Sequence, residues 1–197
     1  MAGGRLRLFL ALDLPEGHRR RAGDVAEELR GRGWDARWVA PDNHHVTLRF
    51  LGATDEAAVP ALRDALAPVA RSSPSLQLSL RGLGAFPTPR RARVLWAGVH
   101  DPSGALPLLA AAMERALEPL GWKPEGRAYT AHLTLARLRA PRSVEPLPPD
   151  PFEGLEPFSV AEVVLYRSRL HPSGARYARI DGFPLGERSP PARGCAP

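Results

Sequence analysis

The chain has 197 residues, of which 44% are apolar and 24% charged, as in an ordinary soluble globular protein. The formal net charge is +6, and Lys123 is the only lysine among the 27 basic residues. Arginine suits bidentate binding of phosphate, so the charge permits a nucleic-acid partner; a genome that encodes Arg in place of Lys is an equally good explanation. The single cysteine, Cys195, excludes an internal disulfide and a cysteine-rich metal site.

The elements follow from the spacing of apolar residues. Val59, Leu62 and Leu66 recur at the three- to four-residue spacing of a helix, whereas Leu76 and Leu78 alternate with polar residues as in a half-buried strand. In chain order the pattern predicts a strand over 5–14, a helix over 16–32, strands over 38–40 and 44–51, a helix from 54 or 55 to 71, strands over 76–83 and 94–99, a helix over 103–120, and strands over 129–138, 158–169 and 176–180.

No apolar run reaches the roughly 18 residues of a membrane span. The apolar run over residues 8–12 is interrupted by Asp13 and is too short for a signal peptide. We therefore expect a cytoplasmic protein without a membrane partner, and we expect a monomer. The Gly-, Pro-, Ser- and Arg-rich residues 186–197 are predicted to be a disordered tail.

The order of elements is repeated. Residues 5–83 and residues 93–183 each read strand, helix and then a strand that contains His-x-Thr-Leu. We predict an α+β fold in a single bilobal domain over residues 1–185. It would have two pseudo-symmetric lobes, each a mostly antiparallel sheet packed on helices, with a central cleft between the two motif strands.

The repeated motif is His45-x-Thr47 in the first half and His132-x-Thr134 in the second, 87 residues later. Residues two apart on a strand point to the same face, so each His lies beside its Thr. Two facing imidazoles can divide the proton transfers of phosphoester hydrolysis, one activating water as base and the other protonating the leaving oxygen as acid.

Hydroxyl groups and an arginine would complete such a site. The hydroxyls of Thr47 and Thr134 can bind phosphate oxygens, and Arg137 is the nearby candidate that can neutralise developing charge. Arg137 lies five residues after His132, and an odd offset puts it on the opposite face of an ideal strand. A bulge or twist is therefore required to bring it into the site.

Structural explanations compete with the functional one. A lone strand histidine is more often a surface or core residue, but two in matching repeat positions favour a function. A zinc site needs three or four ligands, and neither motif supplies a third, so we expect no metal and no cofactor. His44 should point to the opposite face as a structural or rim residue, and the helix-start or turn residues His18, His100 and His171 should be solvated.

Residues 45–52 and 132–137 resemble the paired signatures of the two-histidine phosphoesterase superfamily. The chain is most similar there to the LigT-like RNA 2′,3′-cyclic phosphodiesterases, also called 2′-5′ RNA ligases. Supporting similarity lies at residues 7–15, 84–87 and 93–99, and the resemblance spans roughly residues 5 to 183. One departure is Ala131, where these proteins usually have Pro before the second His.

The resemblance implies an activity and roles for residues. His45 would protonate the leaving oxygen, His132 would activate water, and Thr47 and Thr134 would bind the phosphate. The substrate would be RNA with 2′,3′-cyclic phosphate ends, tRNA fragments among them, opened to 2′-phosphomonoesters without a cofactor. The reverse reaction with a 5′-hydroxyl end would join RNA through a 2′-5′ bond.

A stacking surface for the terminal base is also expected. The candidates are Phe50, Phe86, Trp38 and Tyr129, although filling the core is the preferred explanation for Phe50 and Trp38. The loop that carries Arg90, Arg91 and Arg93 is either a track for the RNA backbone or a solvated basic loop.

Two other functions stay open. The first is a non-catalytic RNA- or nucleotide-binding module, against which the two titratable imidazoles argue. The second is a phosphodiesterase that acts on small cyclic nucleotides or 2′-5′ oligonucleotides. A wide basic cleft, open at one end, would favour RNA, whereas a closed pocket would favour a small molecule.

Overall fold

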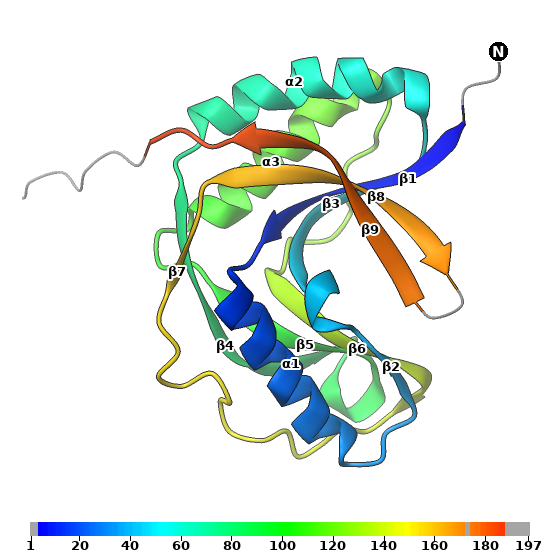
Figure 1. Cartoon of the computed structure of the whole chain (residues 1–197), viewed down its shortest axis with the longest axis vertical. Helices are drawn as coiled ribbons and strands as arrows, with labels where there is room; N and C mark the ends of the chain where they lie inside the picture. The colour runs from blue at the N-terminus through cyan, green and yellow to red at the C-terminus, as the bar shows by residue number, and fades with distance from the viewer. Residues whose placement is uncertain (1–3, 172–173, 188–197) are drawn as a thin grey trace, which may run out of the picture.

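The computed structural model describes residues 4–171 and 174–187, so most of the predicted tail and Cys195 lie outside the described residues. The described residues form nine strands and three α-helices, which confirms the α+β class (Figure 1). The elements are β1 (Arg5–Asp13), α1 (Glu16–Arg30), β2 (Ala36–Trp38), β3 (His45–Asp55), α2 (Val59–Ser72), β4 (Leu76–Phe86), β5 (Ala92–His100), α3 (Ala105–Leu117), β6 (His132–Arg142), β7 (Phe158–Val160), β8 (Glu162–His171) and β9 (Gly174–Pro184), with short 3₁₀ helices at Pro41–Asn43, Glu56–Ala58, Pro89–Arg91 and Glu118–Leu120.

The strands form one curled antiparallel sheet in the order β7-β4-β5-β6-β3-β1-β8-β9, with β2 paired to β6. The two motif strands, β3 and β6, are neighbours at its centre. They pair through a single residue pair, Val46 and Leu133. The sheet therefore has two halves that meet where the two motifs lie.

The halves of the sheet are not the halves of the chain. The bounds of β1 and β3 recur 87 residues later as those of β5 and β6. However, β4 pairs with β5, and β8 pairs with β1, so each repeat contributes a strand to the other half of the sheet. For β4 the cause is local, because a short connection joins it to β5 and the two pair as antiparallel neighbours. The pairing of β8 with β1 instead joins segments at opposite ends of the sequence. An internal comparison of sequences does not detect such pairing.

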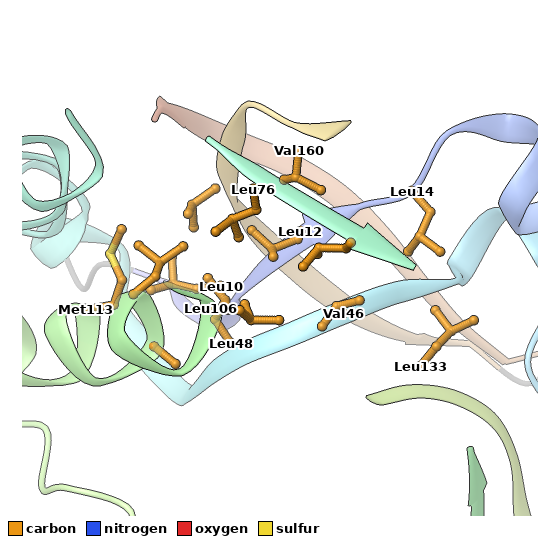
Figure 2. Close-up of a cluster of buried hydrophobic side chains, with 14 of the residues drawn as sticks. Leu10, Leu12, Leu14, Val46, Leu48, Leu76, Leu106, Met113, Leu133 and Val160 are labelled. Carbon is orange, nitrogen blue, oxygen red and sulfur yellow. The ribbon is translucent and has the colours of Figure 1, made fainter. Parts of the chain in front are cut away.

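A buried apolar cluster lies on the inner face of the sheet. Leucines from β1, β3 and β4 pack there with Leu106 and Met113 of α3 (Figure 2). Helices α2 and α3 lie side by side and contribute to this cluster (Figure 1). Val46 and Leu133 are fully buried in the cluster. Side chains alternate along a strand, so the residues before and after Val46, and those before and after Leu133, point to the other face of the sheet.

Strand β3 runs further than its sequence predicts. Gly52 was expected to end it, but the strand continues to Asp55, and Gly52 has a positive φ of 69° that a residue with a side chain rarely adopts. Asp55 then accepts a hydrogen bond from the backbone N–H of Ala57, as expected of an N-cap residue. Within residues 4–171 and 174–187, no helix is both long and apolar enough to cross a membrane.

Helix α3 offers a matched test of this packing. Leu106→Ala removes a fully buried side chain and should lower the free energy of unfolding by about 2 to 5 kcal/mol. Leu108→Ala removes a side chain that is 71% exposed and should change it by less than about 0.5 kcal/mol. Urea unfolding at neutral pH measures both values. Equal effects would contradict the assignment of the inner face of α3.

Candidate active site

The two motifs meet on the outer face of the motif strands. His45, Thr47, His132 and Thr134 are all half-buried there. The antiparallel register that pairs Val46 with Leu133 brings His45 towards Thr134, and Thr47 towards His132. The structure thus gathers the two imidazoles and two hydroxyls that the sequence singled out.

In both imidazoles Nδ1 is hydrogen-bonded to a backbone carbonyl, which leaves Nε2 for the site. His45 Nδ1 lies 2.8 Å from the carbonyl oxygen of Asn43, and His132 Nδ1 lies 2.7 Å from that of Thr130. A carbonyl only accepts hydrogen bonds, so both Nδ1 atoms carry the hydrogen in the neutral ring, and both Nε2 atoms carry a lone pair. His45 Nε2 accepts a hydrogen bond from the Thr47 hydroxyl at 3.1 Å. Each histidine is therefore set up to exchange a proton through Nε2.

Aromatic rings surround both imidazoles. The His45 ring lies 4.9 Å from the ring of Phe9 and 5.1 Å from that of Tyr177, which meets it edge-on. Phe86 meets the His132 ring edge-on at 5.0 Å, and Trp96 lies 6.3 Å from it. These rings keep water from the imidazoles and so disfavour their charged form.

Burial lowers the pKa of both histidines. It lowers the pKa of His45 to about 4, although the Asn43 carbonyl and Asp13 oppose the shift. It also lowers the pKa of His132, against the opposing effect of the Thr130 carbonyl. The positive charge of Arg137 adds to the lowering at both rings. Both imidazoles are consequently neutral at pH 7 in the free protein.

A bulge in each motif strand changes which residues face the site. The pairing of β1 with β3 skips Leu48, and that of β5 with β6 skips Leu135, at equivalent places in the two repeats. The bulge in β6 supplies the change of face that Arg137 requires. The bulge in β3 turns Phe50 outward with 55% of its surface exposed, so the preferred explanation that Phe50 fills the core was wrong.

An open groove of about 400 Å³ is lined in part by Phe9, Asn43 and Tyr177, which also contact His45. Trp38 lines it, although part of its ring packs against the core as expected. The groove combines exposed cations with aromatic rings, the two kinds of group that bind single-stranded nucleic acid. Those side chains are Arg7, Arg37, Arg137, Phe9, Trp38, Phe50 and Tyr177.

Beyond Val46, side chains from the loop before β6 cover the edge of β3. The Tyr129 hydroxyl donates to the carbonyl oxygen of Thr47 at 3.1 Å, and Trp122 Nε1 donates to that of Leu51 at 2.9 Å. Between them, the buried Arg49 guanidinium donates to the carbonyl of Lys123. The bonds from Tyr129 and Trp122 satisfy β3 carbonyls that β6 leaves unpaired, and the bond from Arg49 satisfies a carbonyl of the loop. The hydroxyl of Tyr129 is thus engaged in holding the loop to the first motif strand.

Arg49 also carries the charge of this contact. Its Nη1 lies 3.2 Å from a carboxylate oxygen of Glu114 on α3 and 2.5 Å from one of Glu125 in the loop. The side chain of Arg49 is only 9% exposed, so solvent screens these attractions weakly. Arg49 therefore links the first motif strand both to α3 and to the loop that leads to the second motif.

The loop arginines and His44 have contacts of their own. Arg90 forms an exposed ion pair with Glu145 at 3.3 Å, and its neighbours Arg91 and Arg93 are exposed. His44 is buried on the inner face, and its Nδ1 lies 3.3 Å from the carbonyl oxygen of Arg19, which fits the structural role expected of it.

Among the remaining histidines, His18 was expected to be solvated, and this was wrong. It is half-buried, with Nε2 2.8 Å from the carbonyl oxygen of Glu156 and its ring 4.6 Å from that of Phe158. His100 and His171 are exposed. Across the part of the chain that the structure describes, no group of three His, Cys, Asp or Glu residues could hold a metal ion.

Several residues of the site were missed in the sequence. Phe9 and Trp96 are 87 residues apart, so a residue-by-residue comparison at the offset of the two motifs would have found this pair. No sequence signal points to Tyr177, because it reaches His45 from the last strand of the sheet.

A family model for LigT-like phosphoesterases matches residues 12–96 and 99–177. The chain belongs to this family. Relatives include a protein of Methanothermobacter thermautotrophicus named RNA 2′,3′-cyclic phosphodiesterase, 33% identical over 185 residues, which are 92% of this chain and all of the relative. A Thermotoga maritima protein of the same name is 32% identical over 87% of this chain and 91% of its own length.

Solved structures of this family share the fold. The structure of the Thermus thermophilus protein TT0787 matches with a TM-score of 0.77 and 31% identity, over 93% of this chain and all of that one. E. coli LigT complexed with 3′-AMP matches with a TM-score of 0.75 and 29% identity, over 92% of this chain and 98% of LigT. The curled sheet and its helices are therefore those of LigT-like phosphoesterases.

The contact made by Arg49 can be tested against an exposed ion pair. Arg49→Met leaves two carboxylates without their cation and should lower the free energy of unfolding by about 2 kcal/mol, less than for a fully buried pair because Glu125 is 58% exposed. Arg20→Met breaks the exposed pair with Glu16 and should cost less than about 0.5 kcal/mol. Hydrogen exchange should also quicken at residues 122–131 in Arg49→Met alone. Unchanged exchange there would contradict the role of Arg49 in holding the loop.

Burial of His45 should make stability depend on pH. The unfolded chain binds a proton at His45 near pH 6.5, whereas the folded protein binds it only near pH 4. Between these values the unfolded state binds more protons, so stability falls as the pH falls. Between pH 7 and pH 5 the free energy of unfolding, measured with urea, should fall by about 2 kcal/mol more in the wild type than in His45→Gln. The exposed variant His100→Gln should lose as much as the wild type, and an equal loss in all three proteins would contradict this burial effect.

Proposed function

We propose that this protein hydrolyses the 2′,3′-cyclic phosphate ends of RNA to 2′-phosphomonoesters by paired-histidine acid–base catalysis. The observation that carries the proposal is the convergence of two imidazoles, each with Nε2 free of hydrogen, and two threonine hydroxyls on one face of the motif strands. The relatives named RNA 2′,3′-cyclic phosphodiesterase support the choice of substrate.

The reaction needs one proton taken and one given. His132 Nε2 accepts a proton from water, whose oxygen attacks phosphorus. The bond from phosphorus to the 3′-oxygen breaks, and the leaving oxygen takes a proton from Nε2 of the His45 imidazolium. The Thr47 and Thr134 hydroxyls donate to the non-bridging phosphate oxygens, and Arg137 offsets the charge that builds up on them. The two imidazoles supply both proton transfers, so this chemistry requires no metal or cofactor.

Binding of the anionic substrate favours uptake of the missing proton from solvent. His45 must be charged to act as the acid, yet burial keeps it neutral in the free protein. A phosphate anion placed against Nε2 favours the imidazolium by direct attraction. We propose that the substrate enters with uptake of one proton at His45, so that the acid forms only in the complex.

The groove supports an RNA end over a small cyclic nucleotide. The groove is open. Arg7 of β1 and Arg37 of β2 line it and extend its positive surface beyond Arg137. Phe50 presents an exposed ring there, as stacking of a base requires. We propose that the protein acts on tRNA fragments and other RNA ends as a cytoplasmic monomer, and that the reverse reaction can form 2′-5′ bonds.

An oligoribonucleotide with a 2′,3′-cyclic phosphate end tests the proposal. Incubation in EDTA should yield a 2′-phosphate end, identified by chromatography against 2′- and 3′-phosphate standards. His45→Ala and His132→Ala should each lower kcat by about a hundredfold to ten-thousandfold, because each removes one proton transfer.

Controls separate chemistry from binding. His100→Ala removes an exposed histidine and should retain full activity. Both inactive variants should keep the unfolding midpoint at pH 7 within a few degrees of the wild type and should still bind the oligonucleotide. Binding without turnover by the wild-type protein would instead identify a non-catalytic RNA-binding module. Faster turnover of a cyclic mononucleotide than of the oligonucleotide would favour a small-molecule phosphodiesterase.

A further inference from the structure

A second, smaller pocket of about 140 Å³ lies beside His45. Its walls bring together Asp13 of β1, His44 just before β3, His45 of β3, Tyr166 of β8 and Tyr177 of β9. The proposed proton transfers use none of these residues except His45. The pocket therefore places a group of polar side chains beside one of the two imidazoles.

Asp13 has a defined position in this pocket. It is the direct partner of His45 in the pairing of β1 with β3. Directly opposite residues of an antiparallel pair point to the same face, with Cβ atoms about 5 Å apart. The Tyr166 hydroxyl lies 2.9 Å and 2.8 Å from the two carboxylate oxygens of Asp13, close enough to donate to either. Tyr166 itself is held by stacking on Phe9 at 5.4 Å. The carboxylate is thus fixed beside the imidazole.

His132 has no comparable neighbour. The residue paired with it on β5 is Gly98. The residue 87 positions after Asp13 is His100, which is exposed and pairs with Ser79. The two histidines resemble each other in hydrogen bonding and aromatic surroundings, but only His45 faces a fixed carboxylate among the described residues. This charge is what distinguishes the two halves of the site.

We propose that Asp13, held by Tyr166, is a positioning residue that makes His45 the proton donor of the hydrolysis. The inference rests on the proposed function and adds to it the group that assigns the two roles. A carboxylate beside an imidazole stabilises the imidazolium, so the proton that is taken up from solvent on substrate binding settles on His45. His132 lacks this stabilisation and keeps its lone pair to activate water.

The charges around His45 agree with this assignment. Asp13 raises the pKa of His45 against the effect of burial, whereas His44 and Arg137 lower it. Asp42, the other carboxylate of the pocket, is exposed, and water screens its charge. The titratable and charged groups that face His45 are Asp13 from β1, Arg19 from α1, Asp42 from the 3₁₀ helix before β3, His44 from the residue that joins that helix to β3, Arg137 from β6, Tyr166 from β8 and Tyr177 from β9.

The test compares two leaving groups. On an oligoribonucleotide with an ordinary 2′,3′-cyclic phosphate, Asp13→Asn should lower kcat about tenfold at pH 7 with KM unchanged, because less of the complex carries a proton on His45. Replacing the 3′-oxygen by sulfur gives a leaving group that needs no proton. On that substrate, Asp13→Asn and His45→Ala should both approach the wild-type rate, whereas His132→Ala should stay impaired.

Two further variants control the comparison. Asp42→Asn removes the exposed carboxylate of the same pocket and should match the wild type on both substrates. Tyr166→Phe keeps the ring on Phe9 but loses the bond to Asp13, so it should show a smaller loss that sulfur also restores. It serves as the test if Asp13→Asn does not fold.

The outcomes separate the two proposals. Equal impairment of Asp13→Asn on the oxygen and sulfur substrates, or an unimpaired Asp13→Asn on both, would overturn the role of Asp13 and leave the hydrolysis in place. A wild-type protein that cleaves neither substrate would overturn the proposed function itself. Titration of the imidazole resonances with bound nucleoside 2′-phosphate gives a second readout. In Asp13→Asn, His45 should lose its proton at a lower pH, while His132 should be unchanged.

Discussion

The contact between Val46 and Leu133 is the constraint on which the site depends. It is the one residue pair that joins β3 to β6, and both side chains are fully buried. Burying these two apolar groups orients both strands at once, because the residues on either side must then point to the opposite face. A shift of one residue in either strand would send a histidine and its threonine into the apolar core. Packing therefore enforces the chemical arrangement.

A single pair is too little to hold two strands, and the remainder of the fold supplies what is missing. Each repeat contributes a strand to the other half of the sheet, so the halves cannot separate without breaking β4 from β5 or β8 from β1. The edge of β3 beyond the contact is covered by side chains of the loop before β6, with Arg49 at the centre. The two strands do not pair there, and the loop side chains satisfy the backbone carbonyls of β3 instead.

The same packing sets the electrostatics. Rings from several strands enclose the imidazoles, so burial keeps both neutral in the free protein. An anionic substrate favours the charged form instead, because its negative charge stabilises the imidazolium that burial disfavours. The two halves of the site are alike in backbone geometry, with the same carbonyl contact at Nδ1 and the same bulge. They differ in charge, since a carboxylate fixed by a tyrosine lies beside one ring only.

The sequence by itself determined the chemical groups of this protein. The period of two along a strand placed each histidine beside its threonine, and the repetition of that pattern distinguished His45 and His132 from other histidines. Helix and strand positions followed from local spacing. They agree with the structure apart from the ends of elements such as β3 and the single strand predicted over 158–169, which is two strands, β7 and β8, with different partners. These features depend on neighbours in the chain, so a sequence reveals them.

Only the tertiary structure decided which strands are partners and what surrounds the imidazoles. The pairing of β8 with β1, the bulges that turn Phe50 and Arg137 outward, and the position of Tyr177 beside His45 all depend on pairing between distant segments. That pairing is selected by the burial of the whole apolar face, to which each segment contributes only a part. The position of Asp13 shows the difference: a residue at the end of the first strand is ordinary in the sequence, and the register of β1 with β3 brings it to the imidazole.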